Sequence, residues 1–135
     1  MRTIPLVIAC LTGGLWVLCT IAGDAAEDAK PKKILRHVVL YKFKDDVTPA
    51  QIQEVIDAFS QLPKKVDTII GYEHGVNVSQ EMKSEGLTHC FMVTFRDEAG
   101  RDAYIKSPAH EAYVQVVKDR REKVVVVDFW ADEKN

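Results

Sequence analysis

Three segments of this chain have the pattern of β-strands that are apolar on both faces. Residues 35–43 (LRHVVLYKF), 87–96 (LTHCFMVTFR) and 123–130 (KVVVVDFW) are rich in β-branched and aromatic residues. Successive side chains of a strand point to opposite faces of its sheet. One face of these strands carries Val39, Tyr41, Phe91 and Val126, and the other carries Val38, Leu40, Cys90, Met92, Val125, Val127 and Phe129. A sheet built from them requires cover on both sides.

A helix follows the first strand. Thr48 and Gln51 form a capping box that starts it, Pro49 suits its first position, and Pro63 is expected to end it. Its apolar stripe recurs at helical spacing and consists of Ile52, Val55, Ile56 and Phe59.

The remaining segments complete a β-α-β-β-α-β order. Residues 68–78 are expected to form the second strand, with a bend or bulge at its two glycines. Residues 97–121 are expected to be helical, with a break at Ser107-Pro108. The stripe of the piece after the break consists of Ala112, Tyr113, Val116 and Val117. This order predicts an α+β, ferredoxin-like fold, in which a four-stranded antiparallel sheet has its helices on one face. A second copy is the simplest cover for the other face, packed sheet to sheet in a dimeric α/β barrel.

The N-terminal residues differ in character from the rest. Arg2, an apolar run from Ile4 to Ala22 and small residues after it are typical of a secretory signal peptide, cleaved after Ala22 or Ala25. The alternatives are lipidation and a retained membrane anchor, because the run is nearly long enough to span a bilayer. We expect a signal peptide with its exit over residues 1–25, a flexible spacer over 26–33, one domain over 34–131 and a tail over 132–135. The processed protein would be secreted or periplasmic, with no membrane contact.

Composition argues against several kinds of partner. The net charge is −2 and the charges are interspersed, so the basic stripe that nucleic acid demands is missing. The sequence has no glycine-rich phosphate loop, Ser-His-Asp order or zinc-ligand spacing, and we expect no cofactor and no metal. The pair Arg120-Arg121 is interpreted as a solvated helix end. Leader removal would leave Cys90 alone, as a small buried residue rather than a reactive thiol.

These segments resemble the stress-responsive A/B barrel domain (Dabb) family over about residues 34–131. The resemblance rests on HVVLYKFK from His37, GLTH from Gly86, Tyr104 with SPAH from Ser107, and VVDF from Val126. The resemblance implies a dimeric ferredoxin-like barrel. The family contains plant stress proteins, a plant polyketide cyclase and many uncharacterised bacterial members. The cyclase uses a tyrosine and a histidine six residues later, which correspond to Tyr104 and His110. The family's usual histidine before the proline is Ser107 here.

Tyr104 and His110 could perform acid–base chemistry on a carbonyl compound. His110 is expected in the first turn of a helix, where the partial positive charge favours a neutral imidazole that can accept a proton. Tyr104 could donate a hydrogen bond to a developing oxyanion. The alternative is that the two residues bond each other or the backbone and so fix the helix break.

A further set of side chains is expected on the helix-covered face, where they could bind a ligand in the same interior. This set consists of His37, Val39, Tyr41, His89, Phe91 and Asp128. Two inward histidines allow a metal site, but no short ligand motif accompanies them. We interpret the polar members as a hydrogen-bond network, and His74 as structural.

Three functions are compatible with the sequence. The protein could be a secreted dimer with a stress-related role that binds a small hydrophobic ligand. It could instead be a cyclase- or lyase-type enzyme that acts on a polyketide-like carbonyl substrate, or a purely structural or interaction module. The first two require an interior cavity. An interior packed solid by Tyr41, Phe59, Phe91 and Tyr113 would favour the third.

Overall fold

The computed structural model describes residues 33–132, so the expected signal peptide and its alternatives lie outside the described residues. Within that range, no helix is long and apolar enough to cross a bilayer. The elements are β1 (Lys33–Phe43), α1 (Pro49–Ser60), α2 (Leu62–Lys65), β2 (Ile69–Val76), β3 (His89–Phe95), α3 (Glu98–Ile105), α4 (Pro108–Val117) and β4 (Arg121–Asp132).

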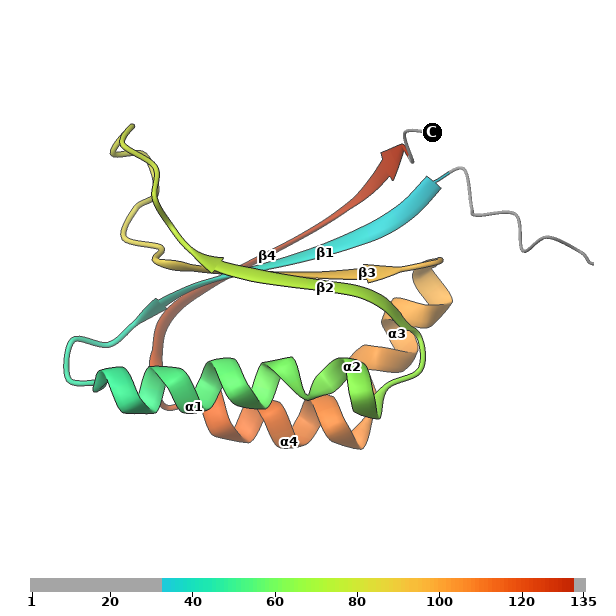
Figure 1. The fold of residues 1–135 in the computed structure, drawn as a ribbon, viewed down its shortest axis with the longest axis horizontal. Helices are drawn as coiled ribbons and strands as arrows, with labels where there is room; N and C mark the ends of the chain where they lie inside the picture. The colour runs from blue at the N-terminus through green and yellow to red at the C-terminus, as the bar shows by residue number, and fades with distance from the viewer. Residues whose placement is uncertain (1–32, 133–135) are drawn as a thin grey trace, which may run out of the picture.

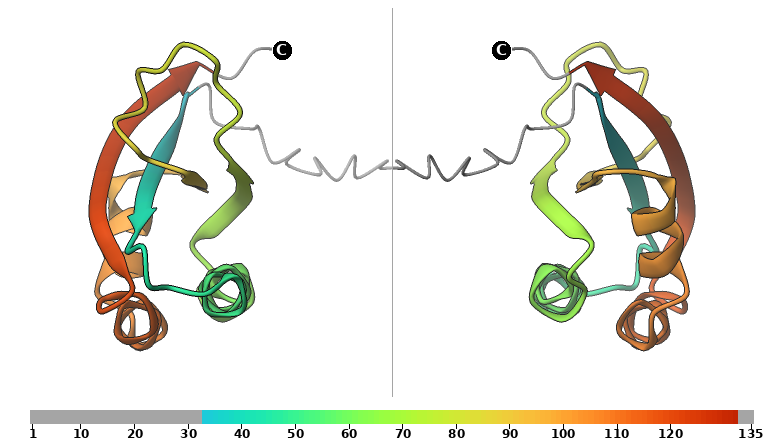
Figure 2. Two further views of the ribbon diagram at one scale, coloured as in Figure 1. Left: turned by 90° about the vertical axis from the view of Figure 1, so that its left-hand side faces the viewer. Right: turned by 90° about the vertical axis from the view of Figure 1, so that its right-hand side faces the viewer.

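The four strands form one antiparallel sheet in the spatial order β2-β3-β1-β4 (Figure 1). This is the ferredoxin-like arrangement that the sequence predicted. β1 is central, and it pairs Tyr41 with His89 of β3 and His37 with Asp128 of β4. α1, α2 and α4 lie against one face of the sheet, and the other face carries no helix (Figures 1 and 2). The predicted placement of the helices is therefore confirmed.

Each of the three longer helices begins at a side chain that satisfies one of its unpaired N–H groups. Thr48 and Gln51 form the expected capping box of α1. Asp97 accepts a hydrogen bond from the N–H of Gly100 at the start of α3. Ser107 caps α4 in the same way, and its extended backbone separates α3 from α4 at the predicted break.

Two details of the helices differ from the sequence prediction. α1 already ends at Ser60, and Pro63 lies in the first turn of α2, where its missing N–H loses no hydrogen bond. Ala112 is exposed, because it lies at the edge of the stripe that α4 turns toward the sheet. Tyr113 and Val117 form the buried part of that stripe.

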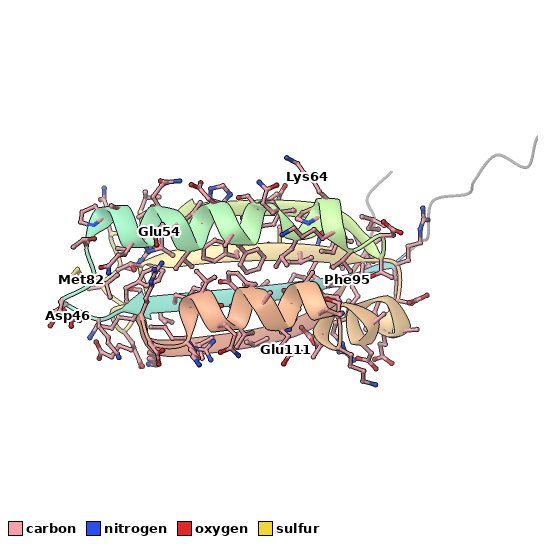
Figure 3. All side chains as sticks on the ribbon, turned by 90° about the horizontal axis from the view of Figure 1, so that it is seen from below. Asp46, Glu54, Lys64, Met82, Phe95 and Glu111 are labelled. Atoms are coloured by element: carbon pink, nitrogen blue, oxygen red, sulfur yellow. The ribbon has the colours of Figure 1, made fainter. Side chains whose placement is uncertain are left out.

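The core lies between the sheet and the helix layer, where side chains of α1 and α4 meet those of the strands (Figure 3). The ring of Phe59 stacks on that of Phe91 at 4.6 Å between centroids and meets the ring of Tyr113 at 4.7 Å. Tyr41 contacts the same group, with its ring 5.6 Å from that of Phe91. These four aromatic side chains, which we call the aromatic cluster, fill the interior beneath β1 and β3.

The opposite face of the sheet is open and apolar. Its apolar side chains in β1 and β3 are half-buried, and in β4 Val127 is 48% and Phe129 45% exposed. The connection between β2 and β3 projects on this open side, away from the helices (Figures 1 and 2). This is the face for which the sequence predicted a second copy.

Candidate functional site

A cavity of about 360 Å³ lies beside the aromatic cluster, between the β1–β4 half of the sheet and helices α3 and α4. Valines from both strands and from α4 form much of its wall. Six polar side chains also line it, and these are His37, Tyr41, Tyr104, His110, Tyr113 and Arg121. An apolar pocket with a few convergent polar groups is the usual form of a small-molecule site. The aromatic cluster thus fills only part of the interior, which weighs against a purely structural module.

Tyr104, near the end of α3, presents its hydroxyl to this cavity. The residue is only 1% exposed, and its hydroxyl forms no hydrogen bond with residues 33–132. No fully buried side-chain polar atom of these residues lacks a partner, so the hydroxyl keeps some accessible surface, at the cavity that Tyr104 lines. Burial also raises the pKa of Tyr104, so the hydroxyl keeps its proton at neutral pH. The side chain is therefore a donor available to a ligand.

His110, in the first turn of α4, lies beside Tyr104 with its ring centroid 4.7 Å from that of the tyrosine. Its Nδ1 atom lies 3.0 Å from the carbonyl oxygen of Ile105, and a carbonyl only accepts, so Nδ1 carries a hydrogen. Burial lowers the pKa of His110, nearby His37 lowers it further, and the bond to Ile105 opposes the shift. The neutral ring then has an unprotonated Nε2 that can accept a proton.

Ser107 fixes the relative position of this pair. Its Oγ donates to the carbonyl oxygen of Tyr104 at 2.7 Å and accepts from the backbone N–H of His110 at 3.1 Å. Ser107 is therefore the N-cap of α4, and it joins the ends of the two helices that carry Tyr104 and His110. The sequence left open that His110 only bonds the backbone at the helix break. Its Nδ1 does form such a bond, to Ile105, but its Nε2 forms none with the described residues.

His37 forms a second polar group with Asp128 and Arg101. The Nδ1 of His37 lies 2.6 Å from Oδ1 of Asp128, and Arg101 donates to Oδ2 of the same carboxylate at 2.8 Å. Burial would raise the pKa of Asp128, but the bonds from His37 and Arg101 outweigh it and hold the pKa below its ordinary value. The ionised carboxylate accepts from Nδ1–H and so fixes which nitrogen of His37 faces a ligand. The ring of His37 lies 5.7 Å from that of Tyr104.

Three side chains of the expected ligand-binding set, those of Phe91, His89 and Asp128, lie outside the cavity lining. Phe91 belongs to the aromatic cluster. His89 is on the same sheet face as His37. It pairs with Tyr41, which lies four residues from His37 along β1, so the two histidines are about 13 Å apart along the strand. The ring of His89 packs against Phe43. Between residues 33 and 132, no three His, Cys, Asp or Glu side chains gather as a metal site would require.

Two other residues of interest lie away from the cavity. His74 is exposed, and its ring stacks on that of Tyr72 at 5.5 Å between centroids. Cys90 is half-buried on the open face of the sheet, and burial raises the pKa of its thiol, which disfavours the reactive thiolate.

Sequence reasoning missed two arginines. Arg101 precedes Tyr104 by three residues on α3, a spacing that places both on one side of the helix. Arg121 was interpreted as part of a solvated helix end, but it is the first residue of β4 and lines the cavity. Nothing in the local sequence distinguishes it from Arg120, which instead pairs with Glu54.

The model of the Stress Responsive A/B Barrel Domain family matches residues 35–131 of this sequence. The chain belongs to this family. A stress-response A/B barrel domain-containing protein of Arabidopsis thaliana is 33% identical over 95 residues, which cover 70% of this chain and 87% of the relative. The olivetolic acid cyclase of Cannabis sativa is 32% identical over 95 residues, which cover 70% of this chain and 94% of the cyclase.

Solved structures of relatives agree with this A/B barrel assignment. A dimeric ferredoxin-like protein of unknown function from Thermobifida fusca is 27% identical, with a TM-score of 0.63 over 72% of this chain and 90% of that chain. The resemblance inferred from the sequence motifs is thus confirmed, for both the family and its fold, and structural relatives are dimeric.

Proposed function

We propose that this A/B barrel protein binds a small, mainly apolar carbonyl compound in the cavity beneath β1 and β4. The observation that carries the proposal is Tyr104, a 1% exposed residue of the cavity wall whose hydroxyl donates no hydrogen bond to residues 33–132. A ligand carbonyl oxygen would supply that acceptor. The valines of the cavity wall would bury the apolar part of the ligand.

A second candidate function is proton transfer on such a ligand. The Nε2 of neutral His110 would remove a proton from the carbon next to the carbonyl, while Tyr104 donates to the oxygen on which negative charge develops. This chemistry is favoured by the arrangement of His110, whose Nδ1–H is already bound to Ile105. It would suit a cyclase- or lyase-type reaction, and the similarity to a cyclase of Cannabis sativa supports it.

Binding is tested by a thermal-shift screen of small aromatic and fatty carbonyl compounds against wild type and Tyr104→Phe. A ligand present at about 100 times its Kd adds about 2.7 kcal/mol of stability, which is readily visible. The matched control is Tyr72→Phe, because the Tyr72 hydroxyl bonds Ser60 outside the cavity. We expect the ligand to stabilise wild type and Tyr72→Phe equally, and Tyr104→Phe less. Equal stabilisation of all three proteins would contradict the proposal.

Proton transfer is tested separately with any ligand that binds. In D₂O, proton abstraction replaces the hydrogens next to the carbonyl with deuterium, which NMR detects. We expect this exchange with wild type and its loss in His110→Gln, while His74→Gln, which changes an exposed histidine outside the cavity, retains it. Binding without exchange would leave only the first function.

A further inference from the structure

Arg121 is a cation at the cavity wall that has no acidic partner among the described residues. Its neighbours in sequence are paired, since Arg120 lies 2.6 Å from Glu54 and Lys123 lies 2.9 Å from Glu85. Arg121 is half-buried and lines the cavity, but it forms no ion pair within residues 33–132. A partly desolvated guanidinium without a carboxylate favours an anion from solution.

Tyr41 supplies a second donor at the same place. Its hydroxyl oxygen accepts a hydrogen bond from the hydroxyl of Tyr113 at 3.0 Å, so its own hydrogen remains available. Arg121 pairs with Phe43, two residues from Tyr41 along β1, and both Arg121 and Tyr41 line the cavity. Burial raises the pKa of Tyr41, while the bond from Tyr113 and the Arg121 cation oppose that shift. Two donors therefore meet at one end of the cavity.

The other polar groups lie toward the far end. His37 and Tyr41 are four residues apart on β1, which corresponds to about 13 Å along the strand. Tyr104 and His110 are grouped at the His37 end. Between the two ends the wall includes Val39 and its partner on β4, Val126, while Val124 lies opposite Tyr41. The cavity thus has a polar group at each end and an apolar middle.

We propose that Arg121 and Tyr41 form a carboxylate subsite, so that the cavity takes an amphipathic carboxylic acid about 13 Å long. The proposal rests on the proposed binding function and assigns its ligand class. A guanidinium binds the two oxygens of a carboxylate in parallel, and the single positive charge balances a single negative one. A phosphate dianion would retain an unbalanced charge beside the single guanidinium. The opposite end of the ligand, with the carbonyl of the proposed function, would lie against Tyr104 and His110.

The test uses full-length protein and isothermal titration calorimetry with decanoate, a fatty carboxylate of suitable length, and with 1-decanol, its neutral counterpart. We expect wild type to bind decanoate more tightly than decanol. Arg121→Gln should weaken decanoate binding about tenfold to a hundredfold, as expected for a lost charge-assisted bond, and leave decanol binding unchanged. The matched control Arg120→Gln removes the same charge one residue away and should bind decanoate like wild type. Circular dichroism melts establish that each variant folds.

The outcomes separate this inference from the binding function. If wild type binds both compounds equally and Arg121→Gln changes neither affinity, the carboxylate subsite is wrong, whereas binding in the cavity stands. If neither compound binds wild type and the carbonyl screen also finds no ligand, the carboxylate subsite and the proposed binding function are both wrong. Tighter binding of decyl phosphate than of decanoate would overturn the choice of a carboxylate.

Discussion

The imidazole of His37 and the carboxylate of Asp128 face each other across the β1–β4 ladder, with Nδ1 and Oδ1 only 2.6 Å apart. Arg101 of α3 reaches the second oxygen of the same carboxylate. Asp128 therefore connects a side chain of the cavity wall with a helix that carries Tyr104. This carboxylate positions His37 and Arg101 rather than contacting the ligand itself, because it is not among the residues that line the cavity.

Replacing Asp128 with asparagine should destabilise the protein at pH 7. The amide oxygen can accept from either His37 or Arg101, while its NH₂ group faces the other donor. The side chain is 28% exposed, so we expect a loss of about 1 to 3 kcal/mol rather than that of a fully buried ion pair. Urea denaturation measures it. Asp132→Asn is the matched control, because that carboxylate is 83% exposed and 3.9 Å from Lys33; equal losses in the two variants would refute the special role of Asp128.

Tyr104 and Tyr113 should respond differently to removal of their hydroxyls. Tyr104→Phe removes a hydroxyl without a hydrogen bond to a described residue, so we expect the free energy of unfolding to stay the same or rise slightly. Tyr113→Phe removes the bond to Tyr41 and should cost about 1 kcal/mol. Both changes are Tyr→Phe at residues no more than 4% exposed, so one is the control for the other in urea denaturation. A larger loss for Tyr104→Phe would mean that its hydroxyl has a structural partner.

Acid should reduce stability through two histidines. Burial lowers the pKa of both His110 and His89 below the ordinary 6.5. As the pH falls through 6.5, the unfolded chain takes up protons that the folded protein does not yet bind, so the free energy of unfolding decreases. Wild type should therefore lose more stability between pH 7.5 and pH 5 than the variant with both histidines changed to glutamine. Urea denaturation at the two pH values compares them, and equal losses would contradict the burial of these rings.

Much of the fold could be predicted because its signals are local. The capping box at Thr48 and the break at Ser107-Pro108 are each specified by residues adjacent in sequence, and both are where expected. The alternation of side chains also assigned His37, Tyr41 and Asp128 correctly to the helix side of the sheet.

The arrangement of the candidate site was less predictable, because it depends on strand register and on side chains distant in sequence. His37 and His89 share a face, but only the pairing of β1 with β3 shows that they lie at different ends of it. Arg121 was missed for a related reason. β4 begins two residues earlier than the apolar run indicates, which moves this arginine from a helix end onto the strand that borders the cavity.

The open face of the sheet predicts a two-fold dimer that a single charge should disrupt. Val127 lies on this face, and the β2–β3 connection with its 92% exposed Met82 projects on the same side. In Val127→Glu, a dimer packed sheet to sheet would bury two carboxylates without a partner, a cost of several kcal/mol. Ala50→Glu adds the same charge at an exposed position on α1 and is the matched control. In sedimentation velocity, wild type and Ala50→Glu should sediment as dimers and Val127→Glu as a folded monomer. A dimeric Val127→Glu would show that the two copies meet through another surface, and the apolar face would then require a different cover.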